Sequence, residues 1–322
     1  MDNMEIIGLG ALNIDNIYRV ERILEDGESL IKEAGSFSGG SAANTIYGLS
    51  RLGIVTGFIG AVGNDNKGKS LIRDFNKLGV ETRYIIVKAK ESTGKTLCLS
   101  DFSGKRSIYV LPGANNQLSI DDINLSYINS ARYLHISSFT GDRQFELILE
   151  LMDKIAPSVK VSFSPGSLYA SKGIKALAPI LSRIHILFIN HDEIQTLIGR
   201  DVVSSSAICL EYGCQIIAVT LGKGVSLTSS TPSAICYIKD SNNEYSIKPV
   251  DVEEFCVDTT GAGDAFATGF LYGLINNKGL DECGKLGNIV ALSSITRMGA
   301  RQGLPTITQL SKFYEEIYNG LL

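Results

Sequence analysis

The sequence predicts an α/β protein with three layers, in which helices cover both faces of a largely parallel β-sheet. Apolar runs of strand length recur along the chain, and they read as strands that are buried on both faces. Amphipathic stretches of helix length separate these runs, which is the pattern of repeated β-α-β units. Two early regions interrupt this rhythm with short strands and tight turns, and they predict a second, small β-sheet.

The large sheet is expected from the apolar runs, and its helices from the periodic stretches between them. The expected strands cover residues 54–59, 133–136, 159–164, 186–190 and 216–220. The expected helices cover residues 67–78, 144–155 and 202–212. A hairpin-rich region at residues 224–249 is expected to extend the large sheet.

The domain organisation follows from the two irregular regions, residues 12–38 and 84–111. After each of them the alternation of strands and helices resumes, so we expect the two regions to form one small sheet, with a hairpin turn at residues 101–105. The core is then expected to consist of residues 1–11, 39–83 and 112–322. A small sheet appended beside a ligand cleft is suited to act as a lid.

Composition narrows the class of protein and its partners. The chain has 322 residues, of which 44% are hydrophobic, and this is ample for a large core. Its 30 basic and 34 acidic residues give a net charge of −4 without any block of like charge. A sequence-independent nucleic-acid surface is therefore not expected, and a small molecule is the expected partner.

Cysteine spacing and the amino terminus indicate the compartment. The six cysteines contain no C-x-x-C pair, which argues against a zinc site or a disulfide scaffold and favours reduced core residues. The amino terminus has no basic region followed by an apolar one, and no apolar run reaches 18 residues. The expectation is a cytoplasmic protein without export signal or membrane span.

The most informative segment is residues 258–264, Asp-Thr-Thr-Gly-Ala-Gly-Asp, followed directly by an apolar stretch at residues 265–275. It predicts a buried helix with Asp264 in its first turn, where backbone N–H groups and the helix dipole form an anion site. A carboxylate there is suited to take the proton of a hydroxyl that attacks a phosphoryl group. The alternative is that Asp264 only caps the helix.

A rival phosphate site is present at residues 63–70, which match the pattern G-x-x-x-x-G-K-[ST]. In that interpretation Lys69 would hold phosphates and Ser70 would hold Mg²⁺ in a P-loop NTPase. No convincing strand ending in a magnesium-binding aspartate accompanies the pattern, so a solvated helix start is the favoured interpretation. The near match to a dinucleotide fingerprint at residues 8–13 lacks its third glycine, where Asn13 stands.

Further polar residues follow strands or open helices, which is where open α/β sheets bind ligands. Asn13 and Asp15 follow the first strand, and residues 39–44, Gly-Gly-Ser-Ala-Ala-Asn, open a helix. Residues 190–193, Asn-His-Asp-Glu, end another strand. A purely local role is the alternative for each, because Asn44 and Glu193 can also stabilise a helix start.

Together these motifs resemble the ribokinase-like (PfkB) carbohydrate kinase family, in its sugar and nucleoside kinase branch, over nearly the whole chain. Its two signatures resemble residues 39–44 and 258–264. The similar segments between them are residues 60–65 with Gly68, 112–115, 190–193 and 219–224. The resemblance implies a ribokinase-like three-layer α/β/α sandwich with a small β-sheet lid, ATP and Mg²⁺ as cofactors, and phosphorylation of a hydroxyl of a sugar or nucleoside.

The resemblance also implies residue roles. Asp264 would be the general base, beside an anion hole formed by Gly261, Ala262 and Gly263. The positions that would hydrogen-bond the acceptor are Asn13, Asp15, Gly39, Gly40 and Asn44. Asn190 and Glu193 would organise Mg²⁺ and its waters, and the nucleotide-binding turn would contain Thr220, Gly222 and Gly224.

Three positions, Asp258, Thr260 and Gly299, match a loop that binds a monovalent cation such as K⁺, although Met298 and Arg301 differ from the commonest ribokinase residues. Ser41 stands where ribokinases usually have lysine, which makes ribose itself a less favoured acceptor. Edges of such lids commonly pair between subunits, so a homodimer through the lid is expected. Besides the P-loop interpretation, a non-catalytic small-molecule sensor on the same fold is an alternative.

Overall fold

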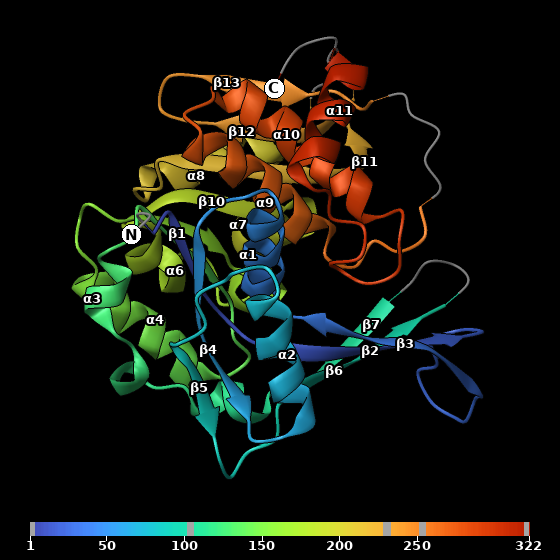
Figure 1. The fold of residues 1–322 in the computed structure, drawn as a ribbon. Coiled ribbons are helices and arrows are strands. Elements are labelled where there is room, and N and C mark those ends of the chain that lie inside the picture. The colour runs from blue at the N-terminus through green and yellow to red at the C-terminus, as the bar shows by residue number, and fades with distance from the viewer. Residues whose placement is uncertain (1–3, 102–105, 228–232, 251–255, 319–321) are drawn as a thin grey trace.

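The computed structural model describes residues 4–101, 106–227, 233–250, 256–318 and 322, and all structural statements below refer to these residues. A nine-stranded sheet runs through the molecule, and a four-stranded sheet projects from one side (Figure 1). In spatial order the large sheet consists of β13 (Glu244–Ile247), β12 (Ala234–Lys239), β11 (Ile216–Val225), β10 (Ile184–Asn190), β9 (Lys160–Ser164), β8 (Tyr133–Ser137), β1 (Ile6–Leu9), β4 (Thr56–Gly63) and β5 (Ile85–Lys88). β12 pairs antiparallel with both of its neighbours, β11 and β13, and all other neighbours pair in parallel.

The five expected strands are confirmed, and their apolar side chains explain their central place. All eight residues of β4 are buried, so this strand contacts protein on both of its faces. β4 begins at Thr56 rather than at residue 54, because the Ile54 N–H donates to the Leu49 carbonyl and closes the end of the preceding helix. The carboxyl ends of these parallel strands meet at one edge, which is the edge where such sheets bind ligands.

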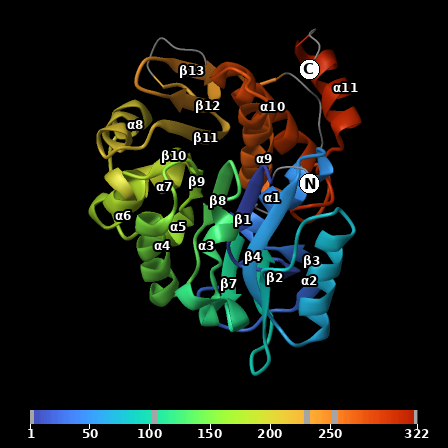
Figure 2. The same cartoon turned by 60° about the vertical axis from the view of Figure 1, so that its left-hand side comes forward.

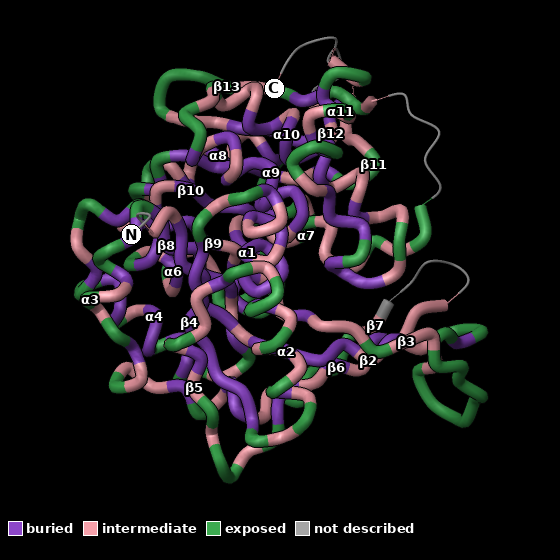
Figure 3. Tube along the Cα trace, in the orientation of Figure 1, coloured by how far each residue is buried: buried purple, intermediate pink, exposed green. Residues whose placement is uncertain are grey.

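Helices cover both faces of the large sheet, which confirms the three layers (Figure 2). One face packs against α1 (Ser41–Arg51), α2 (Asn66–Asn76), α9 (Ala262–Ile275) and α10 (Leu280–Ser294), with α11 (Ile307–Tyr318) outside them. The other face packs against α3 (Leu125–Ile128), α4 (Asp142–Lys154), α5 (Gly166–Ala170), α6 (Ile174–Leu181), α7 (His191–Ile198) and α8 (Val202–Glu211). Buried residues follow the strands and the inward faces of these helices (Figure 3).

α9 lies between α1 and α10, and its small residues explain how closely it packs. A side chain at Gly269 would overlap the backbone of Leu286 in α10, and one at Gly273 would overlap Cys283. On the α1 side, a side chain at Gly48 would overlap Thr268 of α9. The middle of α9 is therefore held between two helices, and tight packing on both sides sets the position of the helix.

The small sheet has the order β3 (Ile31–Gly39), β2 (Asn13–Val20), β6 (Gly94–Ser100) and β7 (Arg106–Leu111). β2 and β6 pair in parallel, whereas the other neighbours pair antiparallel. The expected extent of the second segment, residues 84–111, is corrected at its start, because β5 pairs with β4 in the large sheet. Ile85 buries its side chain in the same cluster as Leu71 and Phe75 of α2, and this burial draws β5 to the core. Of the expected turn at residues 101–105, residues 102–105 lie outside the described residues.

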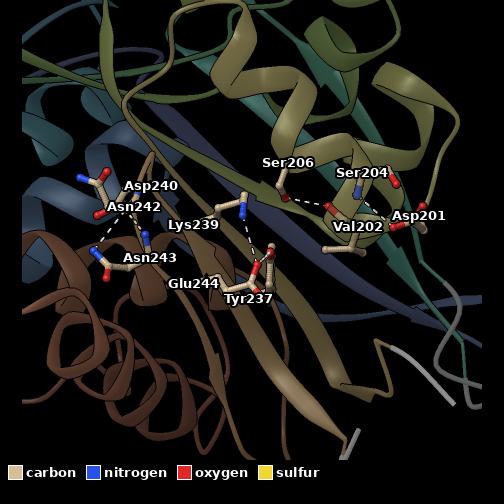
Figure 4. A network of polar contacts seen from close by, with 10 residues as sticks. All are labelled: Asp201, Val202, Ser204, Ser206, Tyr237, Lys239, Asp240, Asn242, Asn243 and Glu244. Atoms are coloured by element: carbon tan, nitrogen blue, oxygen red, sulfur yellow. Dashed lines mark hydrogen bonds and ion pairs between the residues drawn. The ribbon is translucent and has the colours of Figure 1, made fainter. Parts of the chain in front are cut away.

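β12 and β13 extend the large sheet at one edge, as expected from the hairpin-rich region 224–249. Across this hairpin the Tyr237 hydroxyl donates to Glu244 Oε2 at 2.7 Å, and Lys239 Nζ lies 3.1 Å from the same oxygen (Figure 4). Nearby, Asp201 caps α8 by accepting from the Ser204 N–H at 3.0 Å. Within the described parts of the chain, we find no helix that combines the length and the apolar character needed to span a membrane.

Candidate active site

A cavity of about 130 Å³ lies where the first turns of α1, α7 and α9 meet the ends of β10 and β11. Its lining includes polar groups from segments far apart in the sequence, namely Ser41, Asn190, Glu193, Thr220, Gly263 and Asp264. It therefore gathers residues that the sequence assigned to the base, to the anion hole and to the nucleotide side. The cavity also lies at the strand ends, where ligand binding is expected for this type of sheet.

The start of α9 borders this cavity at Gly263, and in the turn that leads into the helix the Ala262 N–H donates to the Thr259 carbonyl at 3.2 Å. Gly261 precedes the helix with φ of 76°, a conformation that glycine adopts without strain, and a side chain there would overlap Ala300. The N–H groups of the first helical turn have no partner within the helix. A side chain built at Gly263 would meet no protein atom within 4 Å, so the space in front of this turn is open.

Asp264 is half-buried, and both of its carboxylate oxygens accept hydrogen bonds from α1. The Ser41 hydroxyl donates to Oδ1 at 2.6 Å, and Asn44 Nδ2 donates to Oδ2 at 2.8 Å. Burial raises the pKa of Asp264 to about 6, although these two hydrogen bonds act in the opposite direction. These side-chain bonds of Asp264 link two helices and do not cap α9, which begins after Gly261 without a side-chain cap.

The small sheet contributes two of the expected acceptor-binding residues, Asp15 and Asn13 of β2. The Thr96 hydroxyl donates to Asp15 Oδ1 at 2.7 Å, and burial raises the pKa of Asp15. Asn115 Nδ2 donates to Asn13 Oδ1 at 2.9 Å. Thr96 and Asn115 thus orient these side chains, and the sequence offered no signal for this role beyond the segment that contains Asn115.

The two expected glycines at the start of α1 permit close contacts. A side chain at Gly39 would overlap the carboxylate of Asp15, which pairs with Phe37, two residues before Gly39 in β3. Gly40 has φ of 104°, and a side chain there would overlap the carbonyl of Ala11. Both positions therefore require glycine, and they bring the backbone before α1 close to β2 and to the strand end.

On the nucleotide side, Asn190 and Glu193 form a reciprocal capping box at the start of α7. Asn190 Oδ1 accepts from the Glu193 N–H at 2.9 Å, and Glu193 Oε2 accepts from the Asn190 N–H at 3.0 Å. Burial raises the pKa of Glu193. The local role that the sequence left open is thus present, and the same two residues also line the cavity.

The end of β11 departs from regular pairing at the predicted nucleotide turn. Between the pairs Thr220–Cys236 and Val225–Ala234, β11 runs through four residues while β12 runs through one. Two of these four are glycines with positive φ, Gly222 at 60° and Gly224 at 107°. The glycines allow the backbone to leave the ladder here, directly after Thr220 at the cavity.

Asp258, Thr260 and Gly299 come together, as the resemblance implied, through hydrogen bonds. The backbone N–H and the hydroxyl of Thr260 donate to Asp258 Oδ1, at 2.9 and 2.7 Å, and the Gly299 N–H donates to Asp258 Oδ2 at 2.9 Å. These bonds tie the segment before α9 to the loop after α10. Because Gly299 directs an N–H toward the carboxylate, the contacts shown are those of a hydrogen-bonded loop, and cation binding there stays a prediction.

The rival loop at residues 63–70 has no free cradle of N–H groups. Asp65 Oδ1 accepts from the Gly68 N–H at 2.8 Å, and its Oδ2 accepts from the Thr93 N–H at 2.8 Å. A side chain at Gly68 would overlap the Gly63 carbonyl, and Lys69 is exposed. An aspartate thus occupies the place that a phosphate would need, and the loop serves as a capped helix start.

A half-buried carboxylate beside an open helix start, at the ends of parallel strands, places the chain among small-molecule kinases. The chain belongs to the pfkB family of carbohydrate kinases, whose family model matches residues 4–307. An uncharacterized sugar kinase from Archaeoglobus fulgidus is 38% identical over 258 residues, which cover 80% of this chain and 98% of that protein.

Solved structures agree with this assignment. The ribokinase from Thermotoga maritima is 25% identical, with a TM-score of 0.81, and the match covers 97% of this chain and 99% of that one. A putative ribokinase II from Escherichia coli, solved in complex with ATP and Mg²⁺, is 21% identical with a TM-score of 0.81, and the coverage is 97% and 99%. The ribokinase-like fold and the class of carbohydrate kinase are thereby confirmed.

Proposed function

We propose that the chain transfers the γ-phosphoryl group of ATP to a hydroxyl of a sugar or nucleoside, with Asp264 as general base. The observation that carries this proposal is the placement of a half-buried carboxylate, whose pKa is raised to about 6, in the first turn of α9 beside the cavity. Such a pKa leaves the carboxylate ionised at neutral pH and still basic enough to take a proton in the transition state. The match to an ATP- and Mg²⁺-bound relative of the same fold supports the choice of cofactors.

In this proposal the acceptor hydroxyl donates its proton to Asp264 as its oxygen attacks. Ser41 and Asn44 hold the carboxylate in place through the bonds described above. The N–H groups of Gly261, Ala262 and Gly263 and the dipole of α9 stabilise the negative charge of the transferring group. Bound Mg²⁺-ATP supplies the phosphoryl group and neutralises part of its charge.

The nucleotide side is proposed from the other wall of the cavity. Carboxylate and amide oxygens are ligands that Mg²⁺ and its waters accept, so Glu193 and Asn190 fit a role at the phosphates. Thr220, Gly222 and Gly224 are proposed to contact the nucleotide through exposed backbone. We propose no catalytic step through a monovalent cation.

The proposed acceptor is uncharged. Asp15 and Asp264 place two carboxylates near the proposed acceptor position, and they would repel an acceptor that carries phosphate at that end. Purified protein with Mg²⁺-ATP is expected to release ADP when a free pentose, a free hexose or a nucleoside is the acceptor. Turnover is not expected to be confined to sugar phosphates. Asp15→Ala is expected to raise KM at least about tenfold, because acceptor hydroxyls lose a buried partner.

Asp26→Ala is the matched control for Asp15→Ala, since Asp26 is exposed in the loop between β2 and β3. Turnover confined to sugar phosphates would contradict the uncharged acceptor while leaving the kinase standing. ATP hydrolysis that needs no acceptor would favour the P-loop interpretation, and ligand binding without turnover would favour the sensor.

We also propose that the small sheet is a lid and that two copies pair through it. Large apolar side chains are exposed on its two edge strands, including Ile31 on β3 and Ile108, Tyr109 and Leu111 on β7, which are 54% to 62% exposed. An open strand edge with exposed apolar side chains favours pairing with another strand. A second copy of this chain is the proposed partner, because an identical edge is always available to it.

The double substitution Tyr109→Glu, Leu111→Lys is expected to convert a dimer to a monomer in sedimentation equilibrium. Val87→Lys is the control, since Val87 is 50% exposed but lies on β5 in the large sheet. A wild-type protein that sediments as a monomer at micromolar concentration would contradict the proposed pairing.

A further inference from the structure

Arg301 is a buried cation beside the proposed base, in the loop that follows α10. Its side chain is 3% exposed, and its guanidinium carbon lies 5.0 Å from the ring centre of Tyr47 and 5.3 Å from that of Phe75. Arg301 Nε donates to Asn44 Oδ1 at 2.9 Å, and Nη2 donates to the Gly39 carbonyl at 3.3 Å. The guanidinium thus reaches the start of α1, where the acceptor-binding residues lie.

These bonds determine which end of the Asn44 amide faces Asp264. A guanidinium only donates and a carboxylate only accepts, so the amide between them can satisfy both in one orientation. In that orientation Oδ1 accepts from Arg301, and Nδ2 donates to Asp264 at 2.8 Å. The flipped amide would set two donors against each other and two acceptors against each other. Arg301 therefore selects the orientation that supports the base.

We propose that Arg301 is a positioning residue for phosphoryl transfer: through Asn44 it directs a hydrogen bond at Asp264, which keeps this carboxylate ionised and aligned. The inference rests on the proposed function, because it assigns Arg301 a role toward the proposed base. It goes beyond the family resemblance, in which Arg301 was noted only as a departure from the commonest residue.

The surrounding charges agree with this role. The negative charges of Asp15, Asp74 and Asp264 act on Arg301, which packs over the Tyr47 ring, while Asp15 and Arg301 are the charged groups that act on Asp264. Burial lowers the pKa of Arg301 to about 10, so the guanidinium stays protonated at neutral pH. Its charge opposes the mutual repulsion of Asp15 and Asp264, and its removal would make ionisation of Asp264 harder.

The test is the pH profile of kcat at saturating acceptor and Mg²⁺-ATP. In Arg301→Gln the acid limb is expected to move upward by about one pH unit, because Asp264 loses a nearby positive charge and an oriented donor. The kcat at pH 6.5 should fall at least about tenfold and recover in part at high pH. Arg301→Lys keeps the charge and is expected to move the limb less. Arg297→Gln, an exposed change in the same loop, is the control and should match wild type.

A double variant tests whether the effect passes through Asn44. If it does, Arg301→Gln should move the acid limb less in the Asn44→Ala background than in the wild type, because the oriented donor is already gone there and only the direct effect of the charge is left to remove. An acid limb that stays at its wild-type pH in Arg301→Gln would overturn the proposal, as would full additivity with Asn44→Ala. Where circular dichroism shows Arg301→Gln to be unfolded, Arg301→Lys and its combination with Asn44→Ala decide by the same two criteria.

The proposal can fail separately from the proposed function. Full activity in Asp264→Asn would refute Asp264 as base. An inactive Asp264→Asn together with an unmoved acid limb in Arg301→Gln would leave the base in place and refute only the role of Arg301.

Discussion

Asp264→Asn is expected to lower kcat by at least about 10²-fold, which is the lower end for the loss of a positioned base. Asparagine has nearly the same shape as aspartate but cannot accept the proton of the attacking hydroxyl. The variant should fold as well as wild type, because burial disfavours the charged carboxylate and raises its pKa to about 6. Measuring ADP release, ATP binding and thermal unfolding on one preparation separates a loss of catalysis from a loss of nucleotide binding or of folded protein.

The pH dependence of kcat in the wild-type protein is a second test of Asp264 as the general base. Because the pKa of Asp264 is raised to about 6, the base is ionised above this pH and becomes protonated as the pH falls through it. The kcat of the wild type should therefore fall on the acid side near pH 6, whereas the residual rate of Asp264→Asn should lack this limb. Asp153→Asn, an exposed change on α4, is the control. Activity near wild type in Asp264→Asn would mean that this carboxylate only braces α1 against α9.

Gly263→Val is expected to abolish phosphoryl transfer while leaving the fold intact. A Cβ atom at Gly263 would meet no atom within 4 Å beyond its own helical turn, so we expect valine to fit without displacing the chain. Valine is also at least as favourable as glycine within a helix. The same open space is where the proposed anion hole receives the phosphoryl group, and a valine side chain would fill it. ADP release should drop to background, with an unfolding temperature within a few degrees of wild type.

The contrasting variant is Lys69→Ala at the rival phosphate loop. Lys69 is exposed, and Asp65 already accepts the Gly68 N–H of this loop together with the Thr93 N–H. Its removal should therefore be nearly silent in ATP binding and turnover, and within about 0.5 kcal/mol in stability. Loss of ATP binding in Lys69→Ala, with Gly263→Val still active, would reverse the order of the two sites.

Some features of the site are local, and the sequence alone could predict them. The helix Ala262–Ile275 follows from a glycine-rich turn and an apolar run, and it places Asp264 in the first turn whatever surrounds it. The capping box of Asn190 and Glu193 spans four residues, so its pattern is visible without tertiary structure. The buried strands likewise follow from continuous apolar runs, because such runs need protein on both faces.

The contacts around Asp264 could not be predicted in this way. Asn44 lies 220 residues from Asp264 and 257 from Arg301, and no periodic pattern reports a hydrogen bond between such distant side chains. Read alone, Arg301 was only a departure from a family pattern, and β5 was assigned to the wrong sheet because its burial against α2 depends on packing. The sequence by itself determined the strands, the helix starts and the chemical groups at them. Only the tertiary structure decided which of these groups are in contact and in which direction their pKa values shift. Both depend on distances across the fold and on the exclusion of water.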